Sequence, residues 1–388
     1  MFADSVWRVL MMGTLFSMNA ALYSYNQGVG KARADIWLSI LVAAIPVAVS
    51  IWLMFSTARR FPDRSLLEAL IVRHPFVGRC IAALYMVFFF IILIRDLRLA
   101  NDFINMVLLP FTPNKVTMLL IILTIILIAR NPADAVIRMN QFWQPLFLLT
   151  GTMIFFMLFN RFELSNFLPM FDNGIVPSLE GAWFYFAFLG EMIVLPFIFS
   201  GREITVRRGL ISLVASVIVL ELIGFALIAV LGAHIPSMLL FPIFNLIEFI
   251  KITDFLDRFE LMLVSIYLPS EIVKCSILLF VLSRGLGHFL SGAGHAANGT
   301  AGQPPASGAG AVRAGGINPS DTIGYPLVVP LGALSFCGAY LFFHDTVELF
   351  PLNRVWPVLS APLVFILPIF LYIFLRPGKQ SIQRQGNR

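Results

Sequence analysis

The sequence predicts an all-α polytopic membrane protein with about ten transmembrane helices. Of its 388 residues 59% are hydrophobic, the mean hydropathy is +0.88, and only 12% are charged. A soluble domain carries about 25% charged residues. The formal net charge is +6. In such a composition a basic excess marks cytoplasmic loops rather than a nucleic-acid-binding surface, so we expect the lipid bilayer as a partner and no nucleic acid.

Ten apolar runs approach the length that crosses a bilayer, about 20 residues. The first is too long, and too polar at its end, for a cleavable signal peptide, so we interpret it as a helix. We place the helices at Val6–Tyr25, Ile36–Ser56, Cys80–Leu109, Val116–Ala129, Asn140–Phe159, Gly181–Ser200, Gly209–Ala233, Leu256–Ser283, Ile323–Phe343 and Trp356–Leu375.

The loop charges orient these helices. Most of the 27 Lys and Arg residues fall in segments that are cytoplasmic if the N-terminus is inside. Lys and Arg concentrate on the cytoplasmic side of membrane proteins. The sequence therefore predicts that both termini are inside and that the number of helices is even.

Ten helices divide into two halves of five. Because each half crosses the membrane an odd number of times, the second half is inverted relative to the first. We expect a five-plus-five inverted-repeat transporter fold in one transmembrane domain, with repeats at about 6–160 and about 181–375. Amphipathic segments at Ser65–Ile71 and Phe244–Ile252 occupy equivalent places on opposite faces. Such loops also occur in large membrane proteins without repeats. Residues 285–322 are rich in Gly and Ala and predict a flexible cytoplasmic linker, and 376–388 form a basic cytoplasmic tail.

The most informative residue is Glu191, a carboxylate inside the apolar run Gly181–Ser200. An ionised side chain at that depth costs a few kcal/mol or more unless it is paired, neutralised or lines a cavity. Glu191 follows Gly190 and precedes Pro196 by five residues, where a helix can break and expose backbone groups to a ligand. This pattern predicts a small-molecule site in mid-membrane. The alternative is a structural Glu paired with a neighbouring helix.

Other polar residues within the predicted helices form a short set. Helix 1 carries Ser17-Met18-Asn19-Ala20 and helix 7 carries Glu221. In an inverted repeat, helices 1, 3, 6 and 8 surround the central site. The charged residues are Arg95, Asp96, Arg98 and Asp102 of helix 3 and Glu271 and Lys274 of helix 8. Spacings of three and four residues place side chains on one helix face, so these residues are either coupling groups of the site or neutral structural pairs.

The sequence carries no recognisable catalytic motif, neither a zinc-protease helix, nor a phosphate-binding loop, nor a nucleophile elbow. The 5 His and 3 Cys lack metal-ligand spacing. We therefore expect neither an enzyme nor a bound metal or cofactor.

Several segments, in order along the whole chain, resemble the spore germination permease family, the B-type subunits of nutrient germinant receptors in the amino acid–polyamine–organocation superfamily. They are Arg95-Asp96 leading to Leu109-Pro-Phe-Thr-Pro113, Ala129-Arg-Asn131 with Arg138-Met-Asn-Gln-Phe-Trp-Gln-Pro145, Phe188-Leu-Gly-Glu-Met-Ile-Val194, Asp257-Arg-Phe-Glu260 continuing to Lys274, and Tyr325-Pro-Leu327.

The resemblance implies a subunit of the inner membrane of a spore that senses a small nutrient, often an amino acid. It also implies two partners, a larger A-type membrane subunit and a C-type lipoprotein subunit. Where the family has a glycine-rich break in helix 1, this chain has Ser17-Met18-Asn19-Ala20, which leaves less room for a ligand carboxylate.

We expect the ligand between broken centres of helices 1 and 6, with half-helix N-termini favouring its carboxylate. Glu191 would face its ammonium group or take up a proton, and Trp183, Phe186 and Phe188 would shape the apolar part. The predicted ligand-binding residues are Ser17, Met18, Asn19, Ala20, Phe188, Leu189, Gly190 and Glu191. A proton-coupled amino acid symporter and a purely structural scaffold remain open, because a fold alone does not determine function.

Overall fold

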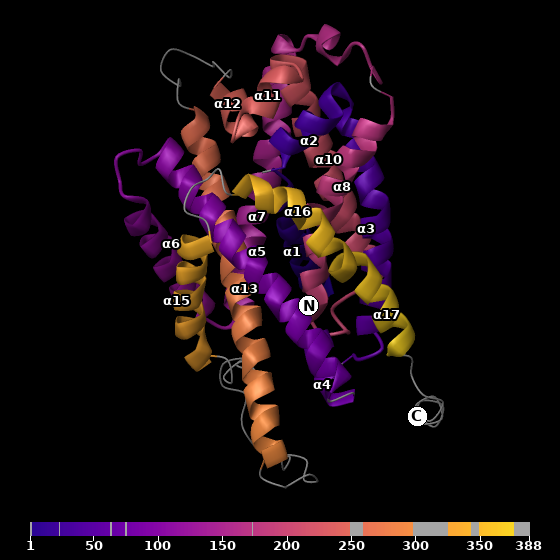
Figure 1. Cartoon of the computed structure of the whole chain (residues 1–388), viewed down its shortest axis with the longest axis vertical. Coiled ribbons are helices and arrows are strands. Elements are labelled where there is room, and N and C mark those ends of the chain that lie inside the picture. The colour runs from indigo at the N-terminus through magenta and orange to yellow at the C-terminus, as the bar shows by residue number, and fades with distance from the viewer. Residues whose placement is uncertain are drawn as a thin grey trace. The chain divides into compact units, whose positions relative to one another are not determined.

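The computed structural model describes residues 2–22, 24–62, 64–73, 76–172, 174–248, 259–297, 325–342 and 349–375 (Figure 1). Every element in these ranges is a helix. The chain divides into two compact units. The first comprises Met1–Leu66, Ile137–Glu271 and Asp345–Arg388, and the second comprises Leu67–Val136 and Ile272–His344. Each unit takes segments from both halves of the sequence, and the predicted division into an early and a late repeat stays a prediction.

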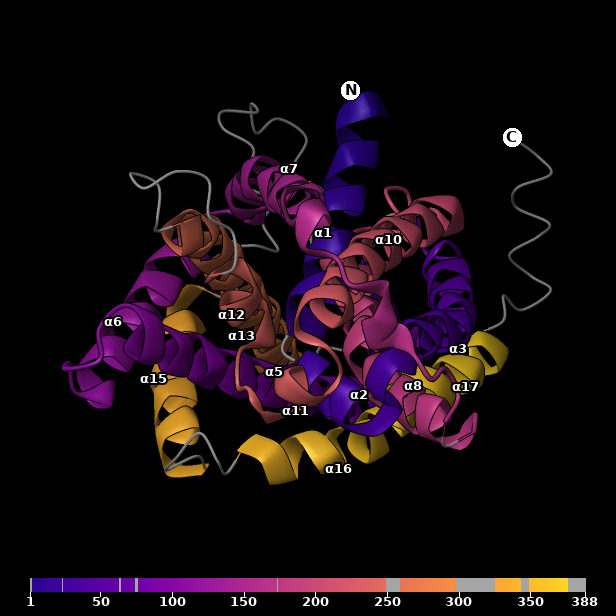
Figure 2. The ribbon, with the colours of Figure 1, turned by 90° about the horizontal axis from the view of Figure 1, so that it is seen from above.

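The first unit is built around α1 (Phe2–Leu22), α3 (Ile36–Ala58), α8 (Val176–Leu189) and α10 (Val206–Leu231). Helix α3 packs against α8 and α10, and α1 packs against α10. A hydrogen bond ties α3 to α8, because Ser39 Oγ donates to the carbonyl of Ser178 at 2.8 Å. Figures 1 and 2 both place α17 beside α3. The shorter elements of this unit are α2 (Tyr25–Ala32), η1 (Arg33–Asp35), η2 (Phe159–Arg161), η3 (Leu164–Phe167), α11 (His234–Met238) and α12 (Pro242–Glu248).

The second unit contains α4 (Leu66–Arg73) from Leu67 onward, α5 (Val77–Val107), α6 (Asn114–Ala129) and α15 (Tyr325–Phe342). Helices α5, α6 and α15 pack against one another, and both ribbon views show α6 beside α15 (Figure 2). Two long helices contribute to both units. They are α7 (Ala133–Leu158) and α13 (Phe259–Ala297).

The predicted spans are confirmed as helices, with ends that differ by several residues. Within the described residues seven helical stretches are long and apolar enough to cross a membrane. They are Tyr25–Ala58, Val77–Val107, Ala133–Arg161, Val176–Ile198, Val206–Leu231, Val264–Phe289 and Val355–Phe374, and two shorter apolar helices cover Asn114–Ala129 and Pro326–Phe342. Helix α1 is a regular helix that is not among those seven.

Of the two predicted helix breaks, the one in helix 6 is present and the one in helix 1 is not at the predicted place. Helix 6 changes at Gly190 from the α-helix α8 to a 3₁₀ segment, η4 (Gly190–Val194), and then continues as α9 (Leu195–Ile198). Helix 1 continues without interruption through Ser17–Ala20 and ends at Leu22, and α2 starts at Tyr25. The expected break at 17–20 is therefore wrong, because this stretch lacks glycine; the Ser17 hydroxyl donates to the carbonyl of Gly13 at 2.7 Å, one turn earlier in the same helix.

The last predicted helix is also interrupted. It consists of α16 (Leu349–Ala361), a π-helical turn η6 (Pro362–Ile366) and α17 (Leu367–Phe374). Proline cannot donate a backbone hydrogen bond, and Pro362 and Pro368 lie at the first turns of η6 and α17. A π-turn adds a residue to the helix and so changes the direction in which the following side chains point.

The flexible linker does not begin at Gly285, because α13 remains helical to Ala297. Gly285 is buried, and a Cβ at this position would collide with Met86 Sδ, so α13 packs closely against α5 there. Several segments named in the sequence analysis lie outside the described residues. They are the rest of the predicted linker, the tail 376–388, Tyr23 and Asp257-Arg258. The amphipathic segments correspond to α4 and to α12 as far as Glu248.

Candidate functional site

The segment η4 carries Glu191 into the interior of the first unit. The Glu191 side chain is 0% exposed, as are its neighbours Leu189 and Met192. Helix α1 packs against η4, so the structure brings helices 1 and 6 together where the site was predicted. The change from α to 3₁₀ geometry shifts the backbone hydrogen-bonding pattern at Glu191. A buried carboxylate beside irregular backbone is the arrangement that membrane transporters use to hold polar ligands.

Gly190 has a packing role that its sequence context did not reveal. A Cβ at Gly190 would lie 2.5 Å from Val364 Cγ1 in η6, closer than real carbon contacts allow. The absence of a side chain therefore lets the start of η4 approach η6. Phe188 is 1% exposed and belongs to the same packed wall.

The predicted residues of α1 point in different directions. The hydroxyls of Ser17 and Ser216 of α10 are 2.6 Å apart, and Asn19 reaches α13. Met18 is fully buried, and its Cε lies near Gly151 of α7. Successive residues of an α-helix turn by about 100°. The four residues cannot all face one ligand, and the side chain of Ala20 lies outside the described part.

Asn19 belongs to a buried polar cluster that joins three helices. Its Nδ2 donates to Ser270 Oγ at 3.1 Å and to Glu271 Oε2 at 3.2 Å, both on α13. Ser270 Oγ donates to Gln144 Oε1 of α7 at 3.0 Å. Tyr267 OH lies 3.5 Å from Glu271 Oε2. We name Asn19, Gln144, Tyr267, Ser270 and Glu271 the α1–α7–α13 cluster.

This cluster retains hydrogen-bonding capacity. Asn19 Oδ1 and Gln144 Nε2 are buried and have no hydrogen-bond partner among the described residues. Buried amides are normally satisfied by protein or by ordered water, so one acceptor and one donor are available to a further polar group. Sequence reasoning singled out Asn19 and Glu271 but missed Gln144 and Ser270. Their signal was their position in apolar helices, Gln144 before Pro145 and Ser270 after Pro269.

In the second unit, Asp96 of α5 is shared by two buried cations. Arg95 Nη2 lies 2.6 Å from Asp96 Oδ1, and Lys274 Nζ of α13 lies 2.7 Å from Asp96 Oδ2. All three side chains are 0% exposed. The sequence placed Lys274 with Glu271 on one face of helix 8, whereas the structure joins it to helix 3. Asp96 therefore links α5 to α13 through its contact with Lys274.

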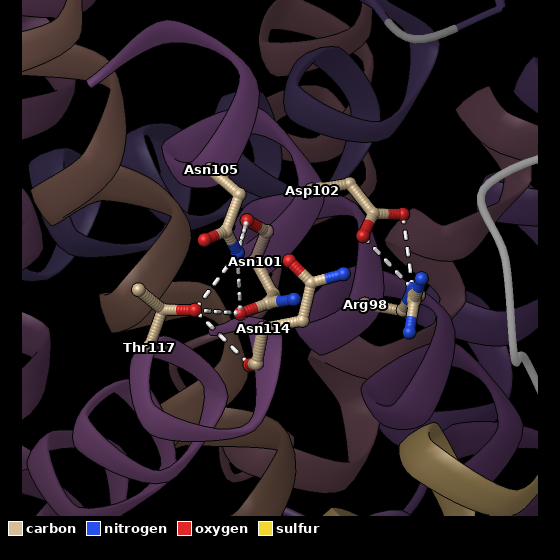
Figure 3. A network of polar contacts seen from close by, with 6 residues as sticks. All are labelled: Arg98, Asn101, Asp102, Asn105, Asn114 and Thr117. Carbon is tan, nitrogen blue, oxygen red and sulfur yellow. Dashed lines mark hydrogen bonds and ion pairs between the residues drawn. The ribbon is translucent and has the colours of Figure 1, made fainter. Parts of the chain in front are cut away.

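The predicted pair of Arg98 and Asp102 is confirmed. Arg98 Nε lies 2.9 Å from Asp102 Oδ1, one turn along α5, as Figure 3 shows. A hydrogen-bonded group of neutral residues lies beside this pair. Thr117 Oγ1 donates to Asn101 Oδ1 at 2.8 Å and accepts from Asn105 Nδ2 at 2.8 Å (Figure 3). These bonds fix the end of α5 to the start of α6 within the second unit.

Two tyrosines pack where helix 1 is interrupted. The rings of Tyr25 and Tyr185 meet edge to face at 5.9 Å, and Tyr25 OH donates to the carbonyl of Leu220 in α10. Trp183, expected to shape the ligand pocket, is instead 45% exposed and stacks on Phe186 at 5.7 Å. Both rings line a cavity with α3 and η6 on the flank of the first unit.

Sequence comparison identifies relatives over most of the chain. The profile of a family described as spore germination protein matches residues 8–293. The Bacillus subtilis (strain 168) protein YfkT, whose name assigns it to spore germination, is 26% identical over 373 residues, which cover 96% of each chain.

Solved transporter structures share the fold. One is Mhp1, a nucleobase-cation-symport-1 family transporter in a closed conformation with bound bromovinylhydantoin. The match covers 92% of this chain and 76% of the Mhp1 chain, with a TM-score of 0.60 and 14% sequence identity. Another is a Na⁺-coupled sialic acid symporter in a substrate-bound, outward-open state. The match covers 95% of this chain and 85% of the symporter chain, with a TM-score of 0.53 and 15% sequence identity. With its apolar helices, the chain is a multi-pass membrane protein of transporter fold.

Proposed function

Since this chain belongs to the spore germination protein family, we propose that it is the nutrient-sensing membrane subunit of a germinant receptor in the spore inner membrane. It binds a small nutrient, an amino acid, in mid-membrane and passes the signal to other subunits. Ligand binding stabilises one of two conformations, and the difference in affinity between them sets the size of the response.

The observation that carries this proposal is the placement of Glu191. It is fully buried in η4, the irregular centre of helix 6, which packs against α1. Burying a carboxylate in a membrane protein is costly, and such residues face a cavity, a partner or a substrate path. In this proposal Glu191 faces the ammonium group of the ligand or takes up a proton.

The α1–α7–α13 cluster provides a second group of polar atoms in the same unit. Asn19 Oδ1 accepts a hydrogen bond from the ligand or from a water molecule that accompanies it, and Gln144 Nε2 donates one. Leu189, Gly190 and Phe188 shape the wall next to Glu191. The ion pairs of Asp96 with Arg95 and Lys274 hold α5 and α13 in register, and through α13 they are connected along the helix to Glu271.

The partners in this proposal are the A-type membrane subunit and the C-type lipoprotein that the family resemblance implies. Co-purification of the three chains from spore membranes tests this part. Recovery of the present chain without either subunit, under conditions that preserve a known three-subunit receptor, would contradict it.

Glu191→Gln tests the site, because it keeps the size of the side chain and removes the charge. In sporulating cells we expect the germination response to the nutrient to fall by at least about tenfold at unchanged protein level, as for a lost charged contact of about 1.4 kcal/mol or more. Glu163→Gln is the matched control, an exposed carboxylate in the loop before α8. A normal response from Glu191→Gln at normal protein level would remove Glu191 from the site.

A second candidate, a proton-coupled amino acid symporter, is favoured by the shared fold of two symporters. Uptake of labelled amino acids into proteoliposomes that contain this chain alone separates the two. A sensor gives saturable retention that does not depend on a proton gradient, whereas accumulation driven by the gradient would make the chain a transporter with Glu191 as its proton site.

A further inference from the structure

Three neighbouring cavities follow one flank of the first unit, and they share lining residues. The most apolar is about 400 Å³ and lies between α3, α8 and η6. Small residues form part of its lining, while the stacked rings of Trp183 and Phe186 form one wall. Its lining includes Pro46, Ala182, Trp183, Phe186, Ala361 and Phe365.

The other two cavities are more polar than the first. The second, about 760 Å³, shares Leu179 and Trp183 with the first and adds Lys31 and Glu180. The third, about 180 Å³, shares Lys31 with the second and adds charged residues of the loops. We name these three adjoining cavities the α8 furrow. Its lining changes along its length from hydrocarbon to charged groups, as an amphiphile requires.

The apolar end of the α8 furrow opens on a surface that faces lipid. Leu179, Trp183 and Ile366 are 50%, 45% and 62% exposed, and all belong to membrane-spanning helices. Trp side chains collect where the hydrocarbon meets the headgroups, and a Lys near a helix end extends its ammonium group toward that layer. The positions of Trp183 and Lys31 therefore place the boundary between acyl chain and headgroup inside the furrow.

The polar end carries both signs of charge. Lys31 Nζ lies 2.9 Å from Glu180 Oε2, and these two side chains are 50% and 52% exposed. The third cavity adds Arg33, Asp35 and Asp172, and Asp35 Oδ2 already accepts from the backbone N–H of Phe171 at 2.9 Å. Two cations beside several carboxylates complement a zwitterion better than an anion, because an anionic headgroup would meet an excess of negative charge.

We propose that the α8 furrow binds one zwitterionic phospholipid of the phosphatidylethanolamine class. Its phosphate lies at Lys31 and Arg33, its ammonium group at Glu180 and Asp172, and one acyl chain passes Trp183 into the cavity of Pro46, Ala182 and Ala361. A flexible acyl chain fits a groove lined by small residues, whereas a helix of a partner protein is about 10–12 Å wide with its side chains.

The lipid lies one layer of side chains from the candidate nutrient site. Phe365 and Ile366 line the apolar cavity, and Val364 of the same π-turn packs against Gly190 at the start of η4. A change in the position of η6 therefore changes the packing of the segment that carries Glu191. This inference does not depend on the proposed function, since the furrow binds lipid whether the chain senses or transports its ligand.

Native mass spectrometry of the purified full chain in detergent tests the proposal, with phosphatidylethanolamine and phosphatidylglycerol of identical acyl chains as probes. We expect one saturable phosphatidylethanolamine molecule that binds several-fold more tightly than phosphatidylglycerol. Ala361→Trp fills the apolar cavity from a partly exposed position and should weaken this binding by at least about tenfold. Ile45→Trp, at a 67% exposed position of α3 outside the furrow, should leave it unchanged.

The polar end is tested separately with a double variant, Lys31→Ala with Arg33→Ala, against Lys115→Ala of α6. We expect only the double variant to weaken binding, and to weaken it for both lipids, because both carry the phosphate that Lys31 and Arg33 contact. If Ala361→Trp does not fold, Trp183→Ala removes an exposed wall of the same cavity and should also weaken binding. Equal binding of both lipids by the wild type, or unchanged binding by the folded cavity variants, would overturn the proposal. So would a photoreactive residue at position 361 that labels a protein instead of lipid in native membranes.

Discussion

Lys274 Nζ lies 2.7 Å from Asp96 Oδ2, and both side chains are fully buried in the second unit. This ion pair connects α13 to α5. Arg95, also on α5, contacts the other oxygen of the same carboxylate. Removal of the carboxylate would leave two cations close together in a medium where their charges are poorly screened.

Asp96→Asn should therefore destabilise the protein strongly. Loss of one partner of a buried ion pair costs about 3–5 kcal/mol, because the remaining charge stays desolvated. The thermal unfolding midpoint in detergent measures the effect. In the double variant Asp96→Asn with Lys274→Met, part of the stability should return, and a double variant as unstable as the sum of the single variants would show that the two side chains do not interact.

Gly190→Ala should destabilise the protein through contact with Val364. The new Cβ would lie 2.5 Å from Val364 Cγ1, and overpacking of a well-packed interior costs about 1–3 kcal/mol. Combination with Val364→Ala should restore the unfolding midpoint. If Gly190 acts only in packing, the same combination restores the germination response, whereas a stable but unresponsive double variant would place Gly190 in ligand binding.

Ser270→Ala should weaken the α1–α7–α13 cluster. It removes the donor to Gln144 Oε1 and an acceptor of Asn19, and unsatisfied buried polar groups cost about 1–3 kcal/mol each. We expect non-additive unfolding free energies for Ser270→Ala and Gln144→Leu, because the second change also removes the orphaned amide. Strict additivity would indicate that the hydrogen bond contributes nothing.

Glu68 of α4 gives a pH-dependent prediction. Burial raises the pKa of its carboxyl, but the hydrogen bond from His288 and the charge of Arg284 outweigh burial and lower the pKa from 4.5 to about 2. Arg284 Nη2 contacts Glu68 Oε1, and His288 Nε2 lies 3.5 Å from the same oxygen. Because the folded pKa is depressed, this contact stabilises the protein fully above about pH 4.5, and the stabilisation is lost as the pH falls toward about 2.

Glu68→Gln should accordingly unfold at a lower temperature than the wild type at pH 7, and the difference should shrink as the pH is lowered below about 4.5. Thermal unfolding at pH 7, 4.5 and 3 measures it, with Glu163→Gln as the exposed control. A difference that is constant across this range would mean that the charge of Glu68 does not contribute.

The class of protein and the order of its helices could be predicted from the amino-acid sequence. Long apolar runs leave no other way to satisfy the backbone inside a bilayer, so composition and run length were sufficient. The pattern Gly190-Glu191 also located the irregular centre of helix 6, since a carboxylate and a glycine interrupt an apolar helix in one place. Arg98 and Asp102 were predictable because a spacing of four residues joins side chains within one helix.

Which residues meet across helices could be learned only from the three-dimensional structure. Lys274 pairs with Asp96, Asn19 and Gln144 join through Ser270, and Gly190 accommodates Val364, although these partners are far apart in the sequence. The sequence also did not predict that helix 1 ends at Leu22 and is not interrupted at Ser17. The physical reason is that spacing along one helix fixes only which face a side chain occupies, whereas its partner depends on the rotation and packing of the neighbouring helix.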